Sequence, residues 1–131
     1  MSQQNVEIVR SMYKTLDGKL HGNFELLAPE VEFHTSGVFP DLDSVYRGRD
    51  GFQLLNDHLN APWAEISLDP DRIIDLGERV LVLSHFQAAG RDGIEARLPI
   101  AHVWTLRNGQ VVRVDAFSDH QKALEAVGLS E

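Results

Sequence analysis

The chain of 131 residues contains no cysteine, and its basic residues are outnumbered by its acidic ones. The missing thiols exclude disulfide bonds and thiolate chemistry. Twelve Lys and Arg against 20 Asp and Glu give a formal net charge of -8, which argues against nucleic acid or an anionic membrane surface as a partner. No apolar run approaches the roughly 20 residues of a membrane-spanning helix.

The N-terminal segment, MSQQNVEIVR, has neither the basic start nor the apolar core of a signal peptide, so we expect a cytoplasmic protein. Hydrophobic residues make up 43% of the chain and charged residues 24%, as in ordinary globular proteins. The length and composition therefore predict a single domain over residues 1–131 with its own apolar core.

The clearest local signal is a hairpin between Leu98 and Asp119. Asn108-Gly109 is a preferred two-residue hairpin turn, and β-branched and aromatic residues dominate on both sides of it. This pattern predicts two long antiparallel strands joined at that turn. Alternating or β-branched runs predict further strands over 31–35, 66–76 and 79–89.

Apolar residues at helical spacing predict four helices. The first covers 2–20, the second runs from Asn23 to Pro29, the third runs from about 49 to Pro62, and the last follows a cap at Ser118 or Asp119. Between them, 36–49 is rich in Gly, Pro and Asp and predicts a long loop of the kind that often has a functional role. The order of elements predicts an α+β domain whose curved antiparallel sheet wraps around the N-terminal helices.

Six segments carry a resemblance to a known superfamily. They are Asn5–Arg10, Leu26–Phe33, Tyr46–Gly51, Asp75–Val80, Ala101–Gly109 and Ala123–Leu129, and the likeness extends over essentially the whole chain. The sequence resembles the nuclear transport factor 2-like superfamily and, within it, the SnoaL-like branch. This resemblance implies a cone-shaped fold with an apolar cavity, and a homodimer formed through the outer face of the sheet. It implies no single activity, because the superfamily contains isomerases, epoxide hydrolases, cyclases and non-enzymatic binders.

Two well-known residue sets of the superfamily are incomplete here. Ketosteroid isomerase-like members use two acids and a tyrosine. By resemblance the acids fall on Thr35 and Ala101, and the tyrosine falls on Met12, next to Tyr13. Limonene epoxide hydrolase-like members use an Asp-Arg-Asp set with a tyrosine and an asparagine. Of these five residues only the second aspartate is present, as Asp119; the others fall on Ser84, Phe86, Phe33 and Thr35.

A SnoaL-like cyclase needs only one aspartate, at the end of the last strand, to act as acid and base. Asp119 matches that position by resemblance, and Tyr13 is a second candidate catalytic residue. Each has a structural alternative. Asp119 begins a predicted helix, where aspartate is a favoured N-cap. Tyr13 lies on the apolar stripe of the first predicted helix and fits a core tyrosine with one hydrogen bond.

Strand alternation divides the central strands into two faces. With the resemblance, it predicts an inward set that lines the ligand pocket together with residues of other elements: Phe33, Thr35, Phe52, Trp63, Ser84, Phe86, Ala101 and Val103. The opposite face carries Leu81, Leu83, His85, His102 and Trp104, an apolar and aromatic patch that predicts the homodimer interface.

The six histidines show no spacing typical of a metal site, so neither a metal nor a cofactor is expected. The sequence predicts a domain that binds a small apolar molecule in its cone. One hypothesis adds a cofactor-free proton transfer, as in a cyclase or isomerase, with Asp119 as acid and base. The alternative is a non-catalytic binding or dimerisation module.

Overall fold

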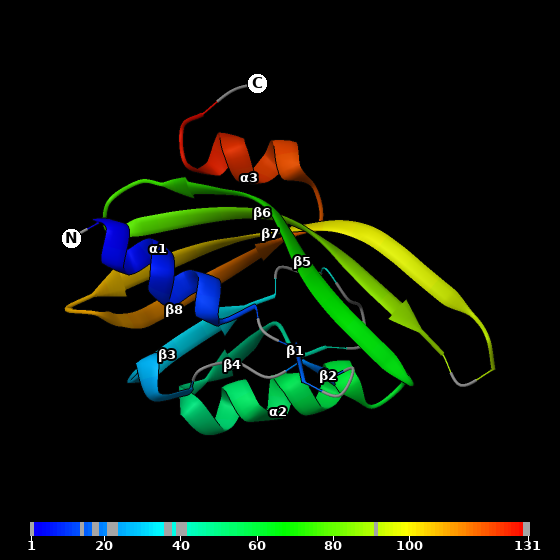
Figure 1. Ribbon diagram of the computed structural model, residues 1–131. Helices are drawn as coiled ribbons and strands as arrows, with labels where there is room; N and C mark the ends of the chain where they lie inside the picture. Colours follow the sequence, from blue (N-terminus) through cyan, green and yellow to red (C-terminus); the bar gives the residue numbers. More distant parts are fainter. Residues whose placement is uncertain are drawn as a thin grey trace.

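A computed structural model describes residues 2–13, 15–16, 19–20, 24–35, 38, 42–90 and 92–129 (Figure 1). The helical elements are α1 (Ser2–Ser11), the 3-10 turn η1 (Phe24–Leu26), α2 (Gly48–Asn60) and α3 (His120–Ala126). The strands are β1 (Thr15–Leu16), β2 (Lys19–Leu20), β3 (Leu27–His34), β4 (Val45–Arg47), β5 (Glu65–Asp75), β6 (Arg79–Ala89), β7 (Glu95–Arg107) and β8 (Gln110–Phe117). None of the described helices is long and apolar enough to cross a bilayer.

Six strands form one curved sheet in the order β4-β3-β8-β7-β6-β5, and β1 and β2 form a separate two-stranded sheet. The predicted α+β class is confirmed. All neighbours in the large sheet are antiparallel except β3 and β8, which run parallel. In Figure 1 the paired strands β5, β6 and β7 extend well beyond β8 and form a long curved arm.

The hairpin at Asn108-Gly109 forms as predicted. Both residues have positive φ, 53° and 78°, which is the backbone geometry that a tight two-residue turn requires. β6 also has the predicted bounds, and α2 lies where the third helix is predicted. Strong turn residues and long β-branched runs therefore located these elements correctly.

Two predicted helices are wrong. The first ends at Ser11, not at Leu20, and the chain then pairs Thr15 with Leu20 in a short hairpin. The helical spacing of apolar residues continues past Ser11, so it did not mark the end. The second shrinks to η1, and Pro29 lies inside β3. The β3–β8 register is irregular between Leu27 and Glu32, where a residue without an amide hydrogen is tolerated.

The helices lie on opposite faces of the sheet. The main core lies on the concave face and joins α1 and α2 to the inner side of the strands, through residues such as Val9, Phe52 and Val82. A second cluster lies on the outer face, where Ala123 and Leu124 of α3 pack against β6 and β7. Because both faces of these strands are covered, β6 carries five consecutive buried residues.

The sheet register shows which residues of β7 point inward. Val82 pairs with His102 and Val80 pairs with Trp104. Directly paired residues of antiparallel strands project to the same face, and both valines belong to the concave core. His102 and Trp104 are therefore interior residues, with 4% and 3% of their surface exposed. The prediction that placed them in a dimer interface is wrong.

The same register places Ala101 and Val103 on the outer face, opposite Leu83 and Leu81. All four side chains are buried beneath α3. Ala101 and Val103 therefore do not line a pocket, which corrects the sequence prediction. Leu81 and Leu83 do face outward as predicted, but α3 already covers them.

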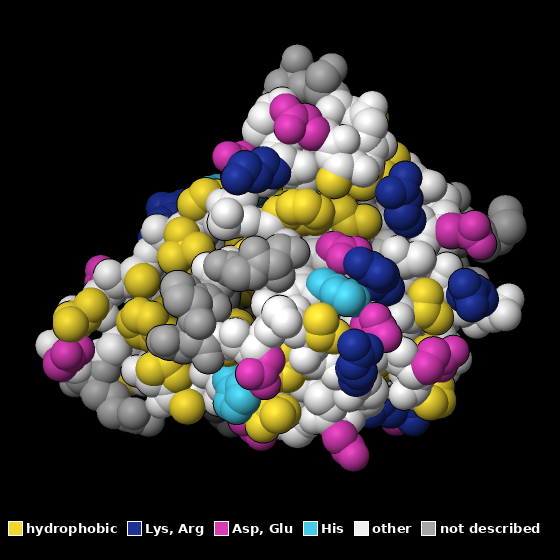
Figure 2. All heavy atoms as spheres, turned by 180° about the vertical axis from the view of Figure 1, so that it is seen from behind, with side chains coloured by type: hydrophobic (Ala, Val, Ile, Leu, Met, Phe, Trp, Pro, Cys, Tyr) yellow, Lys and Arg dark blue, Asp and Glu magenta, His cyan; other side chains and the backbone are white. Residues whose placement is uncertain are grey.

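Elsewhere the outer face carries charged side chains. Glu32 of β3 accepts a hydrogen bond from Arg47 at 2.8 Å, and Arg113 of β8 forms a bidentate pair with Asp115. Figure 2 shows acidic and basic side chains intermixed on one side of the molecule. Of the residues predicted for the dimer interface only His85 is partly exposed. The homodimer itself stays a prediction.

Candidate functional site

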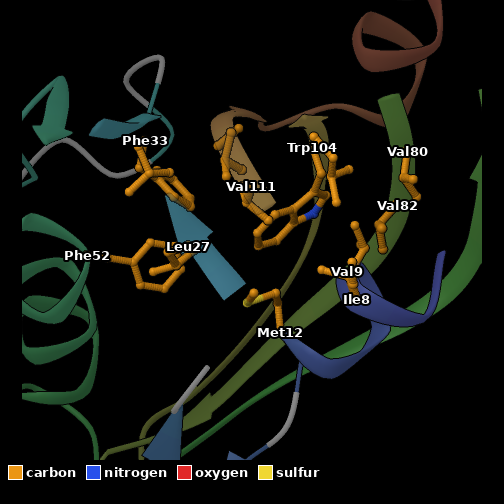
Figure 3. Packing of buried hydrophobic residues seen from close by; sticks show 14 of the residues in the cluster. Ile8, Val9, Met12, Leu27, Phe33, Phe52, Val80, Val82, Trp104 and Val111 are labelled. Carbon is orange, nitrogen blue, oxygen red and sulfur yellow. The ribbon is translucent and has the colours of Figure 1, made fainter. Parts of the chain in front are cut away.

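Two small hollows adjoin each other inside the concave face. Their volumes are about 30 Å³ and 50 Å³. Both are lined by Phe33, Leu55, Leu59, Leu68 and His102; the smaller adds Thr35, Val38, Leu42, Phe86, Ile100 and Ala116, and the larger adds Met12, Tyr13, Phe52, Asn56 and Trp104. Figure 3 shows Phe33, Phe52, Met12 and Trp104 converging on this interior from different elements. Drug-sized ligands occupy roughly 300–1,000 Å³, so this site as it stands suits a much smaller molecule.

Among the residues that the structure describes, no Asp, Glu, Lys or Arg lines either hollow. Of the four polar lining residues, Thr35 uses its hydroxyl to donate to the carbonyl of Asp43 at 2.8 Å. The other three are Tyr13, Asn56 and His102. The site is therefore an apolar interior with a few neutral polar groups.

Tyr13, His102 and Trp104 form a hydrogen-bonded chain inside the core. The indole Nε1–H of Trp104 donates to the Tyr13 hydroxyl at 2.8 Å, and that hydroxyl lies 2.9 Å from Nδ1 of His102. Because the hydroxyl oxygen accepts from the indole, its own proton is free to be donated to Nδ1. A neutral His102 then carries its proton on Nε2, and its ring borders both hollows.

Burial keeps both titrating groups of this chain neutral. Desolvation lowers the pKa of His102 from 6.5 to about 4, because a buried imidazolium loses its hydration. Desolvation raises the pKa of the Tyr13 hydroxyl, and the hydrogen bond from Trp104 opposes that shift only in part. At neutral pH both groups are therefore uncharged, and the geometry favours a Tyr13 hydroxyl that donates to Nδ1 and a His102 proton on Nε2.

Asn56 supplies a second polar group in the larger hollow. It lies on α2 with 8% of its surface exposed, and its side chain forms no hydrogen bond with the residues that the structure describes. Nε2 of His102 likewise has no partner within the described part of the chain. Both side chains border the larger hollow, so their polar groups are available to a ligand or to water there.

The predicted pocket residues fall into three groups. Phe33, Thr35, Phe52 and Phe86 line the hollows. Trp63 and Ser84 lie nearby but line neither hollow: Trp63 packs edge-on against Phe86, and the Ser84 hydroxyl donates to the carbonyl of Ile100. Ala101 and Val103 lie on the other side of the sheet.

Asp119 does not reach the interior. It is the exposed N-cap of α3, and its carboxylate accepts hydrogen bonds from the amides of Gln121 and Lys122 at 2.7 Å and 3.4 Å. This is the structural alternative that the sequence left open. Tyr13 is inside, but none of the described lining residues is an Asp, Glu, Lys or Arg.

Sequence reasoning missed His102 and Asn56 as site residues. Alternation along β7 correctly separates His102 from Ala101, but it does not show which of the two faces inward. The missing information is the register with β6, where Val82 opposes His102. Asn56 gave a weaker signal: it follows Phe52 by four residues on α2 and so lies on the same, buried helix face.

The outer surface offers polar features that do not form a comparable site. His85 forms an ion pair with Asp71, and its ring packs edge-on against that of His120. No group of three potential metal ligands occurs among the residues that the structure describes; His21 lies outside them. Two larger depressions, of about 380 Å³ and 340 Å³, are open to solvent at the ends of strands.

Comparisons with known proteins agree with this fold. The sequence model of the SnoaL-like domain matches residues 9–114. An NTF2-like protein of unknown function from Burkholderia pseudomallei K96243 is 26% identical with a TM-score of 0.73, over 98% of this chain and 99% of that one. No curated protein matches the chain.

Two further solved structures share the fold. TerC, crystallised with polyporic acid, is 24% identical with a TM-score of 0.73, over 93% of this chain and 96% of TerC. A protein from Jannaschia sp. CCS1 that is assigned as a SnoaL-like polyketide cyclase is 21% identical with a TM-score of 0.72, over 96% of this chain and 90% of that one.

Proposed function

Because this chain belongs to the SnoaL-like domain family, we propose that it binds a small, largely apolar organic molecule in the interior of its curved sheet. The observation that carries this proposal is the pair of adjoining hollows, whose lining is apolar apart from a few neutral polar side chains. Apolar lining with few polar groups is the usual composition of small-molecule sites.

The fold neighbours add support. TerC was crystallised with an organic acid, polyporic acid, so a protein of this fold meets organic ligands of that kind. In this chain the two hollows have volumes of about 30 Å³ and 50 Å³, so we expect a ligand no larger than a single small ring. Apolar burial supplies most of the affinity, because each buried methylene contributes about 0.8 kcal/mol.

A cyclase or isomerase activity with Asp119 as acid and base has less support. Proton transfer requires the acid or base within hydrogen-bond reach of the substrate. Asp119 is exposed, and its carboxylate is engaged by two amides at the start of α3. We therefore favour binding over catalysis through Asp119.

The test is a titration with cyclopentanone, monitored by amide NMR spectra, of the wild type and two tryptophan variants of α2. Leu59 lines both hollows, so Leu59→Trp fills them. Leu54 lies on the same helix with 45% of its surface exposed, so Leu54→Trp is the matched control. We expect saturable binding, on the order of 1 mM for so small a ligand, in the wild type and the control.

Leu59→Trp should abolish the saturable shifts while leaving the fold intact by circular dichroism. The proposal is wrong if the wild type shows no saturable binding. It is also wrong if a folded Leu59→Trp variant binds as the wild type does, since the ligand would then occupy another site.

A further inference from the structure

The unpaired polar groups in the interior define which ligand chemistry the site accepts. Nε2–H of His102 is a donor, because the Tyr13 hydroxyl is positioned to donate to Nδ1 on the other side of the ring. The side chain of Asn56, which lines the same hollow, offers two further N–H donors and one acceptor. Among the described groups that face an occupant, donors therefore outnumber acceptors.

The described lining also disfavours charged ligands. A buried charge needs an opposite charge or several hydrogen bonds, and none of the described residues that line the two hollows is an Asp, Glu, Lys or Arg. A hydroxyl group is a poorer match than a carbonyl, since its proton would need the side-chain oxygen of Asn56, whereas a carbonyl uses only the more numerous donors. A carbonyl oxygen accepts from two donors at once and brings no proton.

We propose that the interior site selects a small neutral carbonyl compound, whose oxygen accepts a hydrogen bond from Nε2–H of His102 beside the Asn56 amide. This inference rests on the proposed function and names its ligand class. Tyr13 and Trp104 act as positioning residues: they do not contact the carbonyl, but they orient the His102 ring and hold its proton on Nε2.

The experiment compares cyclopentanone with methylenecyclopentane, which has the same shape but a CH2 group in place of the oxygen. Both probes are titrated into the wild type, His102→Phe and Asn56→Leu. Because the two probes have the same shape, a change in the packing of a variant affects both affinities alike and cancels in their ratio. We expect His102→Phe to lower the ketone-to-alkene ratio about fivefold to tenfold, as for the loss of one buried hydrogen bond.

A spectroscopic measurement keeps the test independent of how well the variants fold. In the wild type, the carbonyl stretching band of bound cyclopentanone should lie at lower frequency than the same band in an alkane solvent, because a hydrogen bond weakens the C=O bond. Tyr13→Phe should weaken this shift, since Nδ1 and Nε2 then compete for the proton. A merely structural role for Tyr13 would leave the band unchanged.

The outcomes separate the two proposals. An unchanged affinity ratio in His102→Phe, or an unshifted carbonyl band in the wild type, overturns the carbonyl inference. Binding of both probes that is lost in Leu59→Trp would still support an apolar binding site. If neither cyclopentanone nor methylenecyclopentane binds, both proposals are overturned.

Discussion

At the scale of single residues, His102 combines burial with a free ring nitrogen. Its direct neighbours in β7, Ala101 and Val103, are apolar, and the imidazole and the Trp104 indole bring hydrogen-bonding groups to the inner face of this strand. Its position costs stability in acid, because burial disfavours the protonated ring. The role of His102 can be tested through the pH dependence of stability and through a substitution of its partner Tyr13.

The first prediction concerns the pH dependence of stability. Folded His102 takes up its proton near pH 4, whereas in the unfolded chain it does so near its ordinary pKa of 6.5. Between these values the unfolded state binds more protons, so the free energy of unfolding falls as the pH drops from about 6.5 to 4. The contribution of His102 to this loss is about 3 kcal/mol.

Urea unfolding at a series of pH values measures this loss, and His102→Gln is the comparison. The variant lacks the titrating group, so its free energy of unfolding should fall less steeply between pH 6.5 and 4. Parallel curves for the two proteins would show that His102 titrates in the folded state as it does in the unfolded one.

The second prediction removes the hydroxyl of Tyr13. Tyr13→Phe leaves Nδ1 of His102 and Nε1 of Trp104 without their buried partner, and each unsatisfied group costs about 1–3 kcal/mol. We expect a clear loss of stability in chemical denaturation. In the His102→Phe background the same change should cost less, because one of the two partners is already gone. Equal losses of stability in both backgrounds would contradict a coupling between Tyr13 and His102.

At the scale of elements, α3 determines how the outer face is used. It packs on β6 and β7 and makes both faces of the central strands buried. This explains why the facing of β7 was not predictable from the sequence: Ala101 and Val103 are as well suited to a buried face as Trp104. Alternation gives two sets of residues, and only the strand register with a known inner face tells them apart.

The third prediction concerns Asp119 as the N-cap of α3. Asp119→Ala should cost about 1 kcal/mol of stability, because two amides lose their acceptor. Asp119→Asn keeps an acceptor and should cost much less. Neither change should alter ketone binding in the interior. If Asp119→Asn abolished binding or a detected turnover at unchanged stability, Asp119 would belong to the site after all.

The fourth prediction tests the packing of α3. Leu124→Ala should cost about 2–5 kcal/mol, since Leu124 is 3% exposed and packs on the outer face of the sheet. Glu125→Ala, at the next and exposed position, is the control and should change stability little. Thermal unfolding compares the two variants. A loss as small as that of the control would mean that α3 is not firmly packed.

At the scale of the whole molecule, the sequence predicted the architecture better than the site. The turn at Asn108-Gly109 located the long strands, the order of elements predicted the α+β class, and the resemblance of six segments predicted the family. The size of the cavity depends on how side chains from α1, α2 and the sheet meet in space, which no local pattern reports. No local pattern reports the parallel pairing of β3 and β8 either, because it joins residues such as Leu27 and Val111 that are far apart in the chain.

The measurement that tests the central claim most directly is a map of the amide NMR shifts that cyclopentanone causes in the wild-type protein. The account predicts that the largest shifts cluster at the lining of the hollows, around Phe33, Leu55 and His102. Shifts that cluster instead around Asp119 and α3, or that grow linearly without saturation, would contradict an interior binding site.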